Sequence, residues 1–167
     1  YWEMLVYIEQ VRERTYMCTE NNTENEEVKS KINKNGTANN RKVAIIGCGF
    51  VGSASAFALM QSALFTEMVL LDANEEKAIG EAYDISHGIP FTRPMQIYAG
   101  GYDDIADAAI IVITAGANQK PDETRLDLVH KNIAIFRSII PEIVKRNFAG
   151  ILLVVANPVD ILTYAAL

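Results

Sequence analysis

The sequence has few cysteines, no excess of basic residues and no long uninterrupted apolar run. Its two cysteines, Cys18 and Cys48, are too few for a disulfide-stapled secreted module and fit a reducing compartment, so we expect a cytoplasmic protein. The formal net charge of −6 argues against a nucleic-acid partner, because duplex binding depends on a basic surface. No apolar run approaches the roughly 20 residues that span a bilayer, so we expect no membrane partner. We also expect no metal site.

The first 40 residues differ in composition from the rest of the chain. In residues 1–17, Glu9 and Arg12 interrupt the apolar stretch that a secretory signal needs. Residues 19–40 contain seven asparagines and only three apolar side chains, too few to offset the entropy of ordering this segment. We therefore predict a disordered N-terminal extension over residues 1–40 and a folded domain over residues 41–167.

From Arg41 onward, short apolar runs alternate with helical patterns. The runs predict five buried strands, at residues 42–47, 67–72, 95–99, 109–114 and 150–156. Strands that alternate with helices predict an α/β fold with a doubly wound parallel sheet, which binds ligands at the carboxyl ends of its strands.

Three helices are predicted between these strands. Residues 50–62 form a small-residue helix, and residues 75–86 form a second helix with one apolar face: Ala78, Ile79, Ala82 and Ile85. A long amphipathic helix follows the fourth strand, with apolar side chains at steps of three and four: Leu126, Val129, Ile133, Phe136, Ile140 and Ile143. Pro141 lies within it, and we expect a kink or a break there.

A G-x-G-x-x-G pattern, Gly47 to Gly52, follows the first strand and opens a helix. Gly47 would permit the tight turn, Gly49 would let a pyrophosphate approach the backbone, and Gly52 would let helix and strand pack closely. Asp72 ends the second strand, where a carboxylate accepts both ribose hydroxyls and repels a 2′-phosphate, which favours NAD over NADP. A merely tight turn and a helix N-cap role for Asp72 stay open as alternatives.

Polar segments follow the fourth and fifth strands. Residues 115–125 have the length and composition of a lid, and Arg125 at their end can bind a carboxylate or polarise a carbonyl. The pair Asn157-Pro158 predicts a turn that brings an amide donor to the same edge of the sheet. A solvated loop charge and simple turn chemistry are the alternatives.

Three further residues with reactive side chains are expected to be structural. His87 and His130 are the only histidines, and we expect structural or surface roles for both. Cys48 lies in the Gly-rich turn, and we expect it to be packed rather than nucleophilic.

Four stretches together resemble the L-lactate dehydrogenases of the lactate/malate dehydrogenase family: KVAIIGCGFVG, LLDA, AGANQKPDETRLDLVHKN and VVANPVDILTY. The resemblance covers residues 41–167, the nucleotide-binding half of that family, and implies a Rossmann domain. It implies an oxidoreductase for reversible hydride transfer between (S)-lactate/pyruvate and NAD, with a role in glycolysis and pyruvate fermentation, in a homotetramer. A malate dehydrogenase-type relative and a non-catalytic NAD-binding module are the alternatives.

The resemblance also implies roles for individual residues. The implied cofactor-binding set is Gly47, Gly49, Val51, Gly52, Asp72, Lys77, Tyr102, Thr114, Gly116, Ala117, Ser138, Val155, Ala156 and Asn157. Arg125 resembles the catalytic arginine that polarises the substrate carbonyl, and Asn157 resembles the asparagine that hydrogen-bonds the substrate oxygen. Gln119 resembles the specificity residue of the lid, where malate enzymes carry Arg. The implied substrate-binding set is Gln119, Arg125, Asn157, Pro158, Val159 and Asp160.

The sequence departs from the family in two ways. Asp122 stands where relatives usually carry Gly, and we expect weaker lid closure or substrate binding from this change. The family's acid/base histidine and its substrate-clamping arginine belong to a C-terminal substrate domain that these 167 residues lack. We therefore expect this chain alone to bind NAD without turnover, and to self-associate through apolar faces left exposed.

Overall fold

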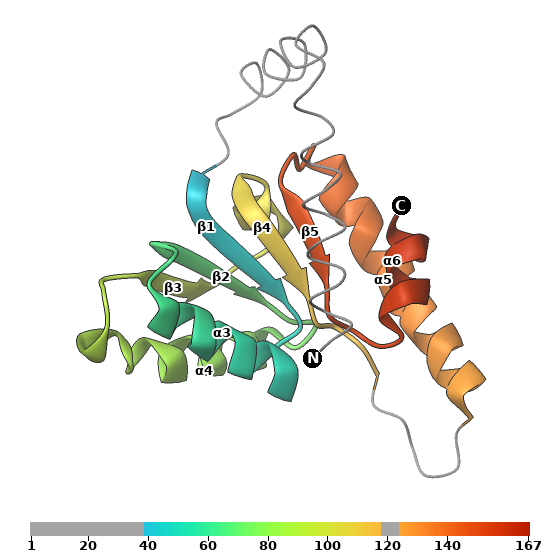
Figure 1. Ribbon diagram of the computed structural model, residues 1–167, viewed down its shortest axis with the longest axis horizontal. Coiled ribbons are helices and arrows are strands. Elements are labelled where there is room, and N and C mark those ends of the chain that lie inside the picture. Colours follow the sequence, from blue (N-terminus) through green and yellow to red (C-terminus); the bar gives the residue numbers. More distant parts are fainter. Residues whose placement is uncertain (1–38, 118–123) are drawn as a thin grey trace, which may run out of the picture. The chain divides into compact units, whose positions relative to one another are not determined.

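A five-stranded parallel sheet forms the centre of the fold in the computed structural model, which describes residues 39–117 and 124–167 (Figure 1). The strands are β1 (Asn39–Ile46), β2 (Glu67–Leu71), β3 (Gln96–Ala99), β4 (Ala108–Ile113) and β5 (Ile151–Val154). Their spatial order is β3-β2-β1-β4-β5. The chain adds β2 and β3 on one side of β1 and then returns to add β4 and β5 on the other side. This order confirms the predicted doubly wound α/β sheet.

Helices cover both faces of the sheet. The longer ones are α3 (Phe50–Ser62), α4 (Glu75–Ser86), α5 (Arg125–Lys145) and α6 (Val159–Ala166), and two short 3-10 helices are η1 (Ile89–Phe91) and η2 (Tyr102–Ile105). In Figure 1, α3 and α4 lie on one side of the sheet and α5 and α6 on the other. Local capping explains two of the starts: the Asn74 side chain accepts from the Lys77 amide, and Thr124 and Asp127 form a capping box.

The side chains of β1 divide the core into two layers. Val43 and Ile45 pack with residues of α3 and α4, whereas Ala44 and Ile46 pack with residues of η2, α5 and α6. All four are at most 4% exposed. A strand buried on both faces must be apolar at every position, which is why the predicted run is continuous rather than alternating.

Helix α5 differs from its prediction in two ways. Of the kink or break expected at Pro141, the break is wrong, because the helix continues to Lys145. Ile139 and Ile143 on either side of Pro141 are buried, so packing against the sheet holds the last turn in place. The buried face is also rotated from the predicted one, since it contains Asn132 and Ile139 while Leu126 is 70% exposed. In α4, Ile79 likewise lies outside the buried face.

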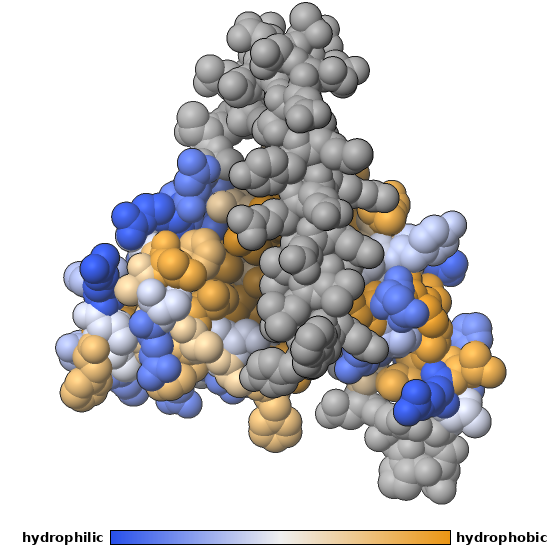
Figure 2. Space-filling model, in the orientation of Figure 1, coloured by the Kyte–Doolittle hydropathy of each residue, from blue (hydrophilic) through white to orange (hydrophobic). Residues whose placement is uncertain are grey.

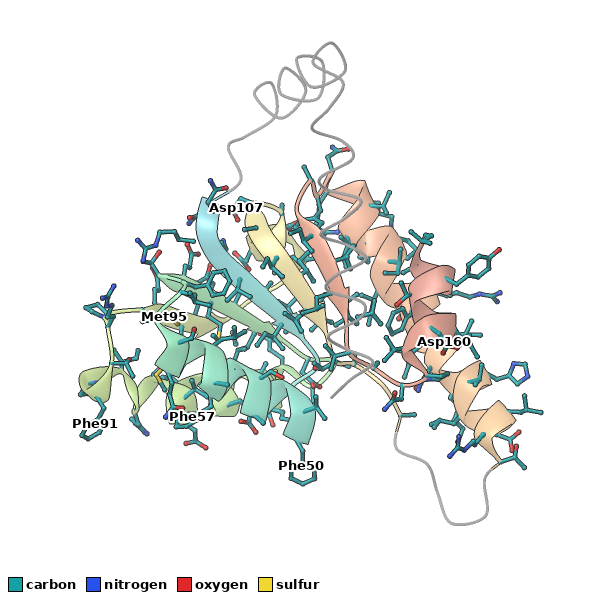
Figure 3. The ribbon with its side chains drawn as sticks, in the orientation of Figure 1. Phe50, Phe57, Phe91, Met95, Asp107 and Asp160 are labelled. Carbon is teal, nitrogen blue, oxygen red and sulfur yellow. The ribbon has the colours of Figure 1, made fainter. Side chains whose placement is uncertain are left out.

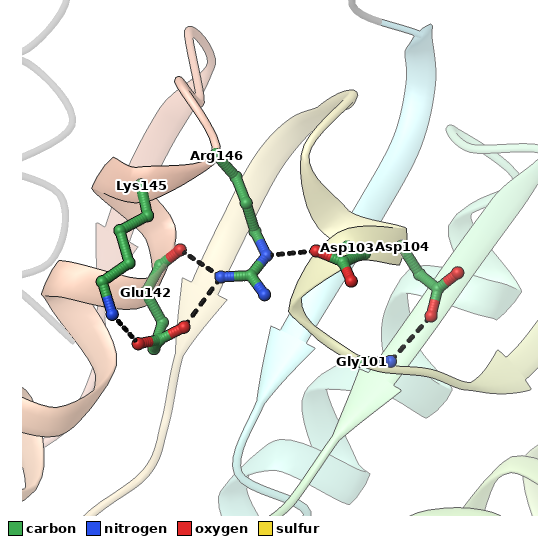
Figure 4. Close-up of polar contacts among 6 residues, drawn as sticks. All are labelled: Gly101, Asp103, Asp104, Glu142, Lys145 and Arg146. Atoms are coloured by element: carbon green, nitrogen blue, oxygen red, sulfur yellow. Dashed lines mark hydrogen bonds and ion pairs between the residues drawn. The ribbon is translucent and has the colours of Figure 1, made fainter.

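An ionic cluster fastens η2 to the C-terminal end of α5 (Figure 4). The Arg146 guanidinium donates to Asp103 Oδ1 at 2.6 Å and to Glu142 Oε2 at 2.8 Å, and it lies 5.4 Å from the centre of the Tyr102 ring. Burial, and then the negative charge of Glu142, raise the pKa of the Tyr102 hydroxyl. Tyr102 is therefore a packed neutral ring between η2 and the end of α5.

Apolar side chains remain exposed around α5 and α6, where Figure 2 shows apolar surface at the right of the view. The large ones are Leu126, Val144, Ile161, Tyr164 and Leu167, each at least 40% exposed. Within residues 39–117 and 124–167, no helix combines the length and apolar character needed to cross a membrane.

A buried lysine crosslinks the amino-terminal edge of the sheet. Lys42 Nζ lies 3.0 Å from Glu67 Oε1 and 2.8 Å from Asp107 Oδ1, with only 6% of the lysine side chain exposed. Burial opposes its charge, but the hydrogen bonds with Asp107 and Glu67 outweigh that cost and raise the pKa of Lys42 above its usual value. Glu67 also accepts from the Tyr98 hydroxyl at 2.8 Å. In Figure 3, Asp107 lies near the start of β1, at the opposite end of the sheet from Phe50.

We predict that Lys42→Met lowers the free energy of unfolding by about 2–4 kcal/mol, because it leaves the Glu67 carboxylate without its cation in a mostly buried position. Urea denaturation of the 167-residue chain measures the change. Lys145→Met is the matched control, since it removes an exposed lysine from a surface pair with Glu142 and leaves the unfolding midpoint unchanged. Equal midpoints for Lys42→Met and wild type would contradict the structural role of this pair.

Candidate functional site

The turn after β1 brings three backbone segments into close contact. Gly47 has φ +104°, and a Cβ there would lie 2.6 Å from the Ala115 nitrogen. A Cβ on Gly52 would lie 1.9 Å from the Gly47 carbonyl oxygen and 2.8 Å from Thr114 Oγ1. The Thr114 hydroxyl donates to that same carbonyl oxygen at 2.6 Å. Only glycines at positions 47 and 52 therefore allow β1, α3 and the end of β4 to meet at this distance.

The N-terminal end of α3 has the features of an anion site. Gly49 is its N-cap and supplies no side-chain cap, so the amides of Phe50, Val51 and Gly52 have no acceptor within the helix. A Cβ built on Gly49 would meet nothing within 4 Å, which leaves the approach to these amides open. Phe50 is 95% exposed and projects away from the helix end (Figure 3). This combination of free amides and open backbone fits a pyrophosphate group.

Asp72 lies directly beside this turn. Its Oδ2 accepts from the Cys48 amide at 2.7 Å, and its Oδ1 accepts from the Asn74 amide at 2.9 Å. The N-cap of α4 is Asn74, so the alternative of an N-cap role for Asp72 is wrong. Each carboxylate oxygen keeps a further lone pair for a ligand hydroxyl. The two backbone bonds hold the carboxylate at the mouth of the turn, where it can accept from a ribose.

Cys48 is a packed thiol, as predicted. It is 2% exposed, and its Sγ donates to the Leu71 carbonyl oxygen at 3.6 Å. Burial, and then the nearby charge of Asp72, raise the pKa of the Cys48 thiol to about 11. The thiol is therefore neutral at ordinary pH and cannot act as a nucleophile. His87 is the C-cap of α4 and His130 is exposed on α5, which agrees with the structural or surface roles expected for both.

A second group of predicted residues lies where β4 and β5 end. Thr114, Gly116 and Ala117 follow β4, and Val155, Ala156 and Asn157 follow β5. The Val155 and Ala156 amides both donate to the Ile113 carbonyl oxygen, at 2.9 and 3.3 Å, so the two segments stay paired beyond the strands. The Asn157-Pro158 peptide bond is cis, and Pro158 is the N-cap of α6, which begins with Val159 and Asp160.

Asn132 joins these two segments and was not among the predicted residues. Its Oδ1 accepts from the Ala117 amide and its Nδ2 donates to the Asn157 carbonyl oxygen, both at 2.7 Å. The side chain is 2% exposed, on the inner face of α5. A polar residue among the apolar positions of an amphipathic helix was the available signal in the sequence, since a buried amide needs partners for both of its ends.

The remaining predicted residues are more scattered. Arg125 is the first residue of α5 and exposed, about two turns from Asn132. Lys77 lies in the first turn of α4. Burial and the charges of Asp72 and Glu81 raise the pKa of the Cys48 thiol, and the charge of Lys77 acts in the opposite direction. Gln119 and the expected effect of Asp122 lie outside the described residues.

Two predicted cofactor residues lie apart from both groups, Ser138 on α5 and Tyr102 at the start of η2. Ser138 is exposed, and its hydroxyl donates to the Ile135 carbonyl oxygen at 2.7 Å. Tyr102 packs under Arg146. Arg146 lies about 30 Å from Arg125 along α5. The described contacts do not connect either residue to the Gly-rich turn.

Comparisons of sequence and of structure with known proteins agree on one family. The family model described as "lactate/malate dehydrogenase, NAD binding domain" matches residues 41–167. An L-lactate dehydrogenase of Thermoanaerobacterium saccharolyticum is 63% identical over 123 residues, which cover 74% of this chain and 40% of the relative. An L-lactate dehydrogenase of Priestia megaterium is 58% identical over 128 residues, which cover 77% of this chain and 40% of the relative.

Solved structures of the same family share the fold. The minor L-lactate dehydrogenase of Enterococcus mundtii in its ligand-bound form matches with a TM-score of 0.73 at 45% identity, over 76% of this chain and 41% of the other. A malate dehydrogenase of Archaeoglobus fulgidus in complex with NADH matches with a TM-score of 0.70 at 38% identity, over 75% of this chain and 43% of the other. The chain thus spans about 40% of the length of its curated relatives. It belongs to the lactate/malate dehydrogenase family and contains that family's NAD-binding Rossmann domain.

Proposed function

We propose that this chain forms the NAD-binding half of an L-lactate dehydrogenase, which interconverts (S)-lactate and pyruvate. The observation that carries the proposal is the arrangement at the Gly-rich turn. Uncapped amides at the start of α3 face open space over Gly49, and the Asp72 carboxylate is held beside them by the Cys48 amide at 2.7 Å. An anion and a ribose can therefore be bound side by side.

The two groups of site residues correspond to two halves of the cofactor. Gly47, Gly49, Val51 and Gly52 would hold the pyrophosphate through backbone amides, while Asp72 and Lys77 would hold the adenosine ribose. The segments after β4 and β5 would hold the nicotinamide half: Thr114, Gly116, Ala117, Val155, Ala156 and Asn157. When bound, NAD supplies the hydride acceptor. Tyr102 and Ser138 stay predictions, because their described contacts, with Arg146 and with the Ile135 carbonyl oxygen, lend them no support.

The substrate side of the proposal rests on Arg125, Asn157 and Gln119. Arg125 would polarise the substrate carbonyl with its planar guanidinium, and the Asn157 amide would donate to the substrate oxygen. Gln119 is neutral, so it favours a methyl group over a second carboxylate at that end of the substrate. Pro158, Val159 and Asp160 at the start of α6 would complete the substrate-binding set.

The complete enzyme would be a cytoplasmic homotetramer with a role in glycolysis and pyruvate fermentation. The apolar side chains exposed on α5 and α6, among them Leu126 and Tyr164 at 70% and 82%, support association with further protein surface. A disordered extension stays a prediction for residues 1–38, and it is wrong for Asn39 and Asn40, which begin β1.

Two alanine substitutions in the Gly-rich turn should separate binding from folding. Gly49→Ala places a methyl group in the open approach to the α3 amides, so we predict at least about tenfold weaker NADH binding with an unchanged unfolding midpoint. Gly52→Ala drives a Cβ to 1.9 Å from the Gly47 carbonyl oxygen, so we predict a large loss of stability. Calorimetric titration and thermal unfolding of the 167-residue chain measure both effects. Full NADH affinity in Gly49→Ala would contradict the pyrophosphate site.

The cofactor preference should depend on Asp72. We predict that wild type binds NADH more tightly than NADPH, because the carboxylate repels a 2′-phosphate. Asp72→Ala should weaken NADH binding about tenfold or more and narrow the difference between the two cofactors. Asp84→Ala is the matched control, since it removes an exposed carboxylate from α4 outside the site. Equal affinities of wild type for NADH and NADPH would argue against the assigned ribose contact.

Substrate choice separates the lactate enzyme from the malate dehydrogenase alternative. In the complete enzyme that carries this half, we predict a higher kcat/KM for pyruvate than for oxaloacetate, and a reversal of that order in Gln119→Arg. The reason is that a guanidinium pairs with the second carboxylate of oxaloacetate, whereas the neutral amide leaves it unpaired. Steady-state kinetics with both acids decide the question, and a wild-type preference for oxaloacetate would favour a malate dehydrogenase.

A further inference from the structure

The Asn132 side chain connects the segment after β4 with the segment after β5 through two hydrogen bonds. Its amide accepts from Ala117 N and donates to Asn157 O, both at 2.7 Å. Both polar ends of a side chain that is 2% exposed are thus satisfied by backbone groups. An aliphatic side chain of the same size would leave the part-buried Ala117 amide and Asn157 carbonyl oxygen without this partner.

The surroundings of Gly116 show how near these groups lie to one another. A Cβ built on Gly116 would lie 3.5 Å from Asn132 Oδ1 and 3.6 Å from the Ala156 Cβ, so one methyl group would span the space between them. The asparagine amide is therefore next to both segments and reaches both through its hydrogen bonds. A side chain at position 132 that is shorter or apolar breaks one or both bonds and removes this link between the segments.

We propose that Asn132 is a positioning residue that sets the separation of the two backbone segments receiving the nicotinamide half of the cofactor. The proposal rests on the proposed NAD-binding function. In a doubly wound sheet the first mononucleotide half binds at β1 and β2, and the second binds across the switch point at β4 and β5. Asn132 fixes only the second half, so its loss affects the nicotinamide end of the cofactor and spares the adenosine end.

The experiment compares two ligands on the 167-residue chain. NADH occupies both halves of the site, whereas ADP carries only the adenosine and pyrophosphate. Calorimetric titrations give the ratio of their dissociation constants for wild type, Asn132→Leu and Phe136→Leu. The control removes packing volume from a residue that is 1% exposed on the same helix and contacts neither segment through a hydrogen bond, so it lowers the unfolding midpoint without changing the ratio.

The expected result is about tenfold weaker NADH binding in Asn132→Leu, with ADP binding unchanged. An equal loss for both ligands, or a loss for neither, overturns the positioning role and leaves the proposed function intact. Failure of wild type to bind either ligand overturns the proposed function, and the positioning role with it. The two failures are therefore distinguishable.

A second variant keeps the test decisive if Asn132→Leu does not fold. Asn132→Asp retains the size of the side chain and the acceptor for Ala117, but an ionised carboxylate cannot donate to the Asn157 carbonyl oxygen. Protonation restores the donor, and burial favours the protonated form. We expect the NADH/ADP affinity ratio to be reduced about tenfold at pH 8 and to return toward wild type at pH 5.5.

The NADH/ADP affinity ratio of wild type is also measured at both pH values, and the ratio of the variant is compared with it at each pH. Strands β4 and β5 carry no ionisable side chain. The ionisable residues near position 132 on the packed helices are exposed: His130 and Lys131 on α5, Asp160 and Tyr164 on α6. Asp103 of η2 lies at the other end of α5, paired with Arg146. Carbon-13 NMR of the new side chain gives the pH at which its carboxyl group is ionised. A ratio for Asn132→Asp that equals the wild-type ratio at a pH where this carboxyl group is ionised overturns the positioning role.

Discussion

The site depends on the contact between the Gly47 carbonyl oxygen and its two neighbours. Thr114 donates a hydrogen bond to this oxygen at 2.6 Å, and the Cα of Gly52 lies so close that a Cβ would be 1.9 Å away. One carbonyl group thus joins the end of β1, the first turn of α3 and the end of β4. Because these elements meet at the switch point of the sheet, their closeness decides whether the two halves of a dinucleotide site face each other.

Side chains extend this crosslinking across the carboxyl edge of the sheet. The Asp72 carboxylate links the end of β2 to the turn after β1, the Thr114 hydroxyl links β4 to that turn, and the Asn132 amide links the segments after β4 and β5. Each link uses a backbone amide or carbonyl that would otherwise lack a partner at a strand end. The polar groups that hold the site together are therefore also the groups that satisfy its exposed backbone.

The sequence predicted local features far better than contacts between distant residues. Helices α3 and α4 begin and end at the predicted residues, and the strands agree with their predicted ranges to within a few residues. The predicted buried face of α5 was right at Phe136 and Ile143, but it missed Ile139 and wrongly included Leu126, because adjacent apolar stripes satisfy the same period and packing against the sheet selects between them. The glycine pattern and Asp72 were predicted because their spacing is a sequence fingerprint of a doubly wound sheet.

Other site features depend on partners that lie far away in the sequence. Asn132 needs Asn157, 25 residues later, and Tyr102 needs Arg146. A helical pattern records which positions are apolar, but it does not indicate which distant backbone groups require a donor or an acceptor. For that reason the bridging asparagine was missed, and the contact between Tyr102 and Arg146 was not predicted.

The two edges of the sheet use polar burial for different purposes. At the amino edge, the buried Lys42 binds the two carboxylates of Glu67 and Asp107, so its charge is compensated within the fold. At the carboxyl edge, Asp72 is held by backbone amides alone, and the amides at the start of α3 have no side-chain cap. The amino edge pairs its lysine within the fold, whereas the carboxyl edge keeps a carboxylate and free amides for a ligand. The free lone pairs of Asp72 and the amides at the start of α3 give this edge the hydrogen-bonding capacity that a binding site needs and that the fold does not use itself.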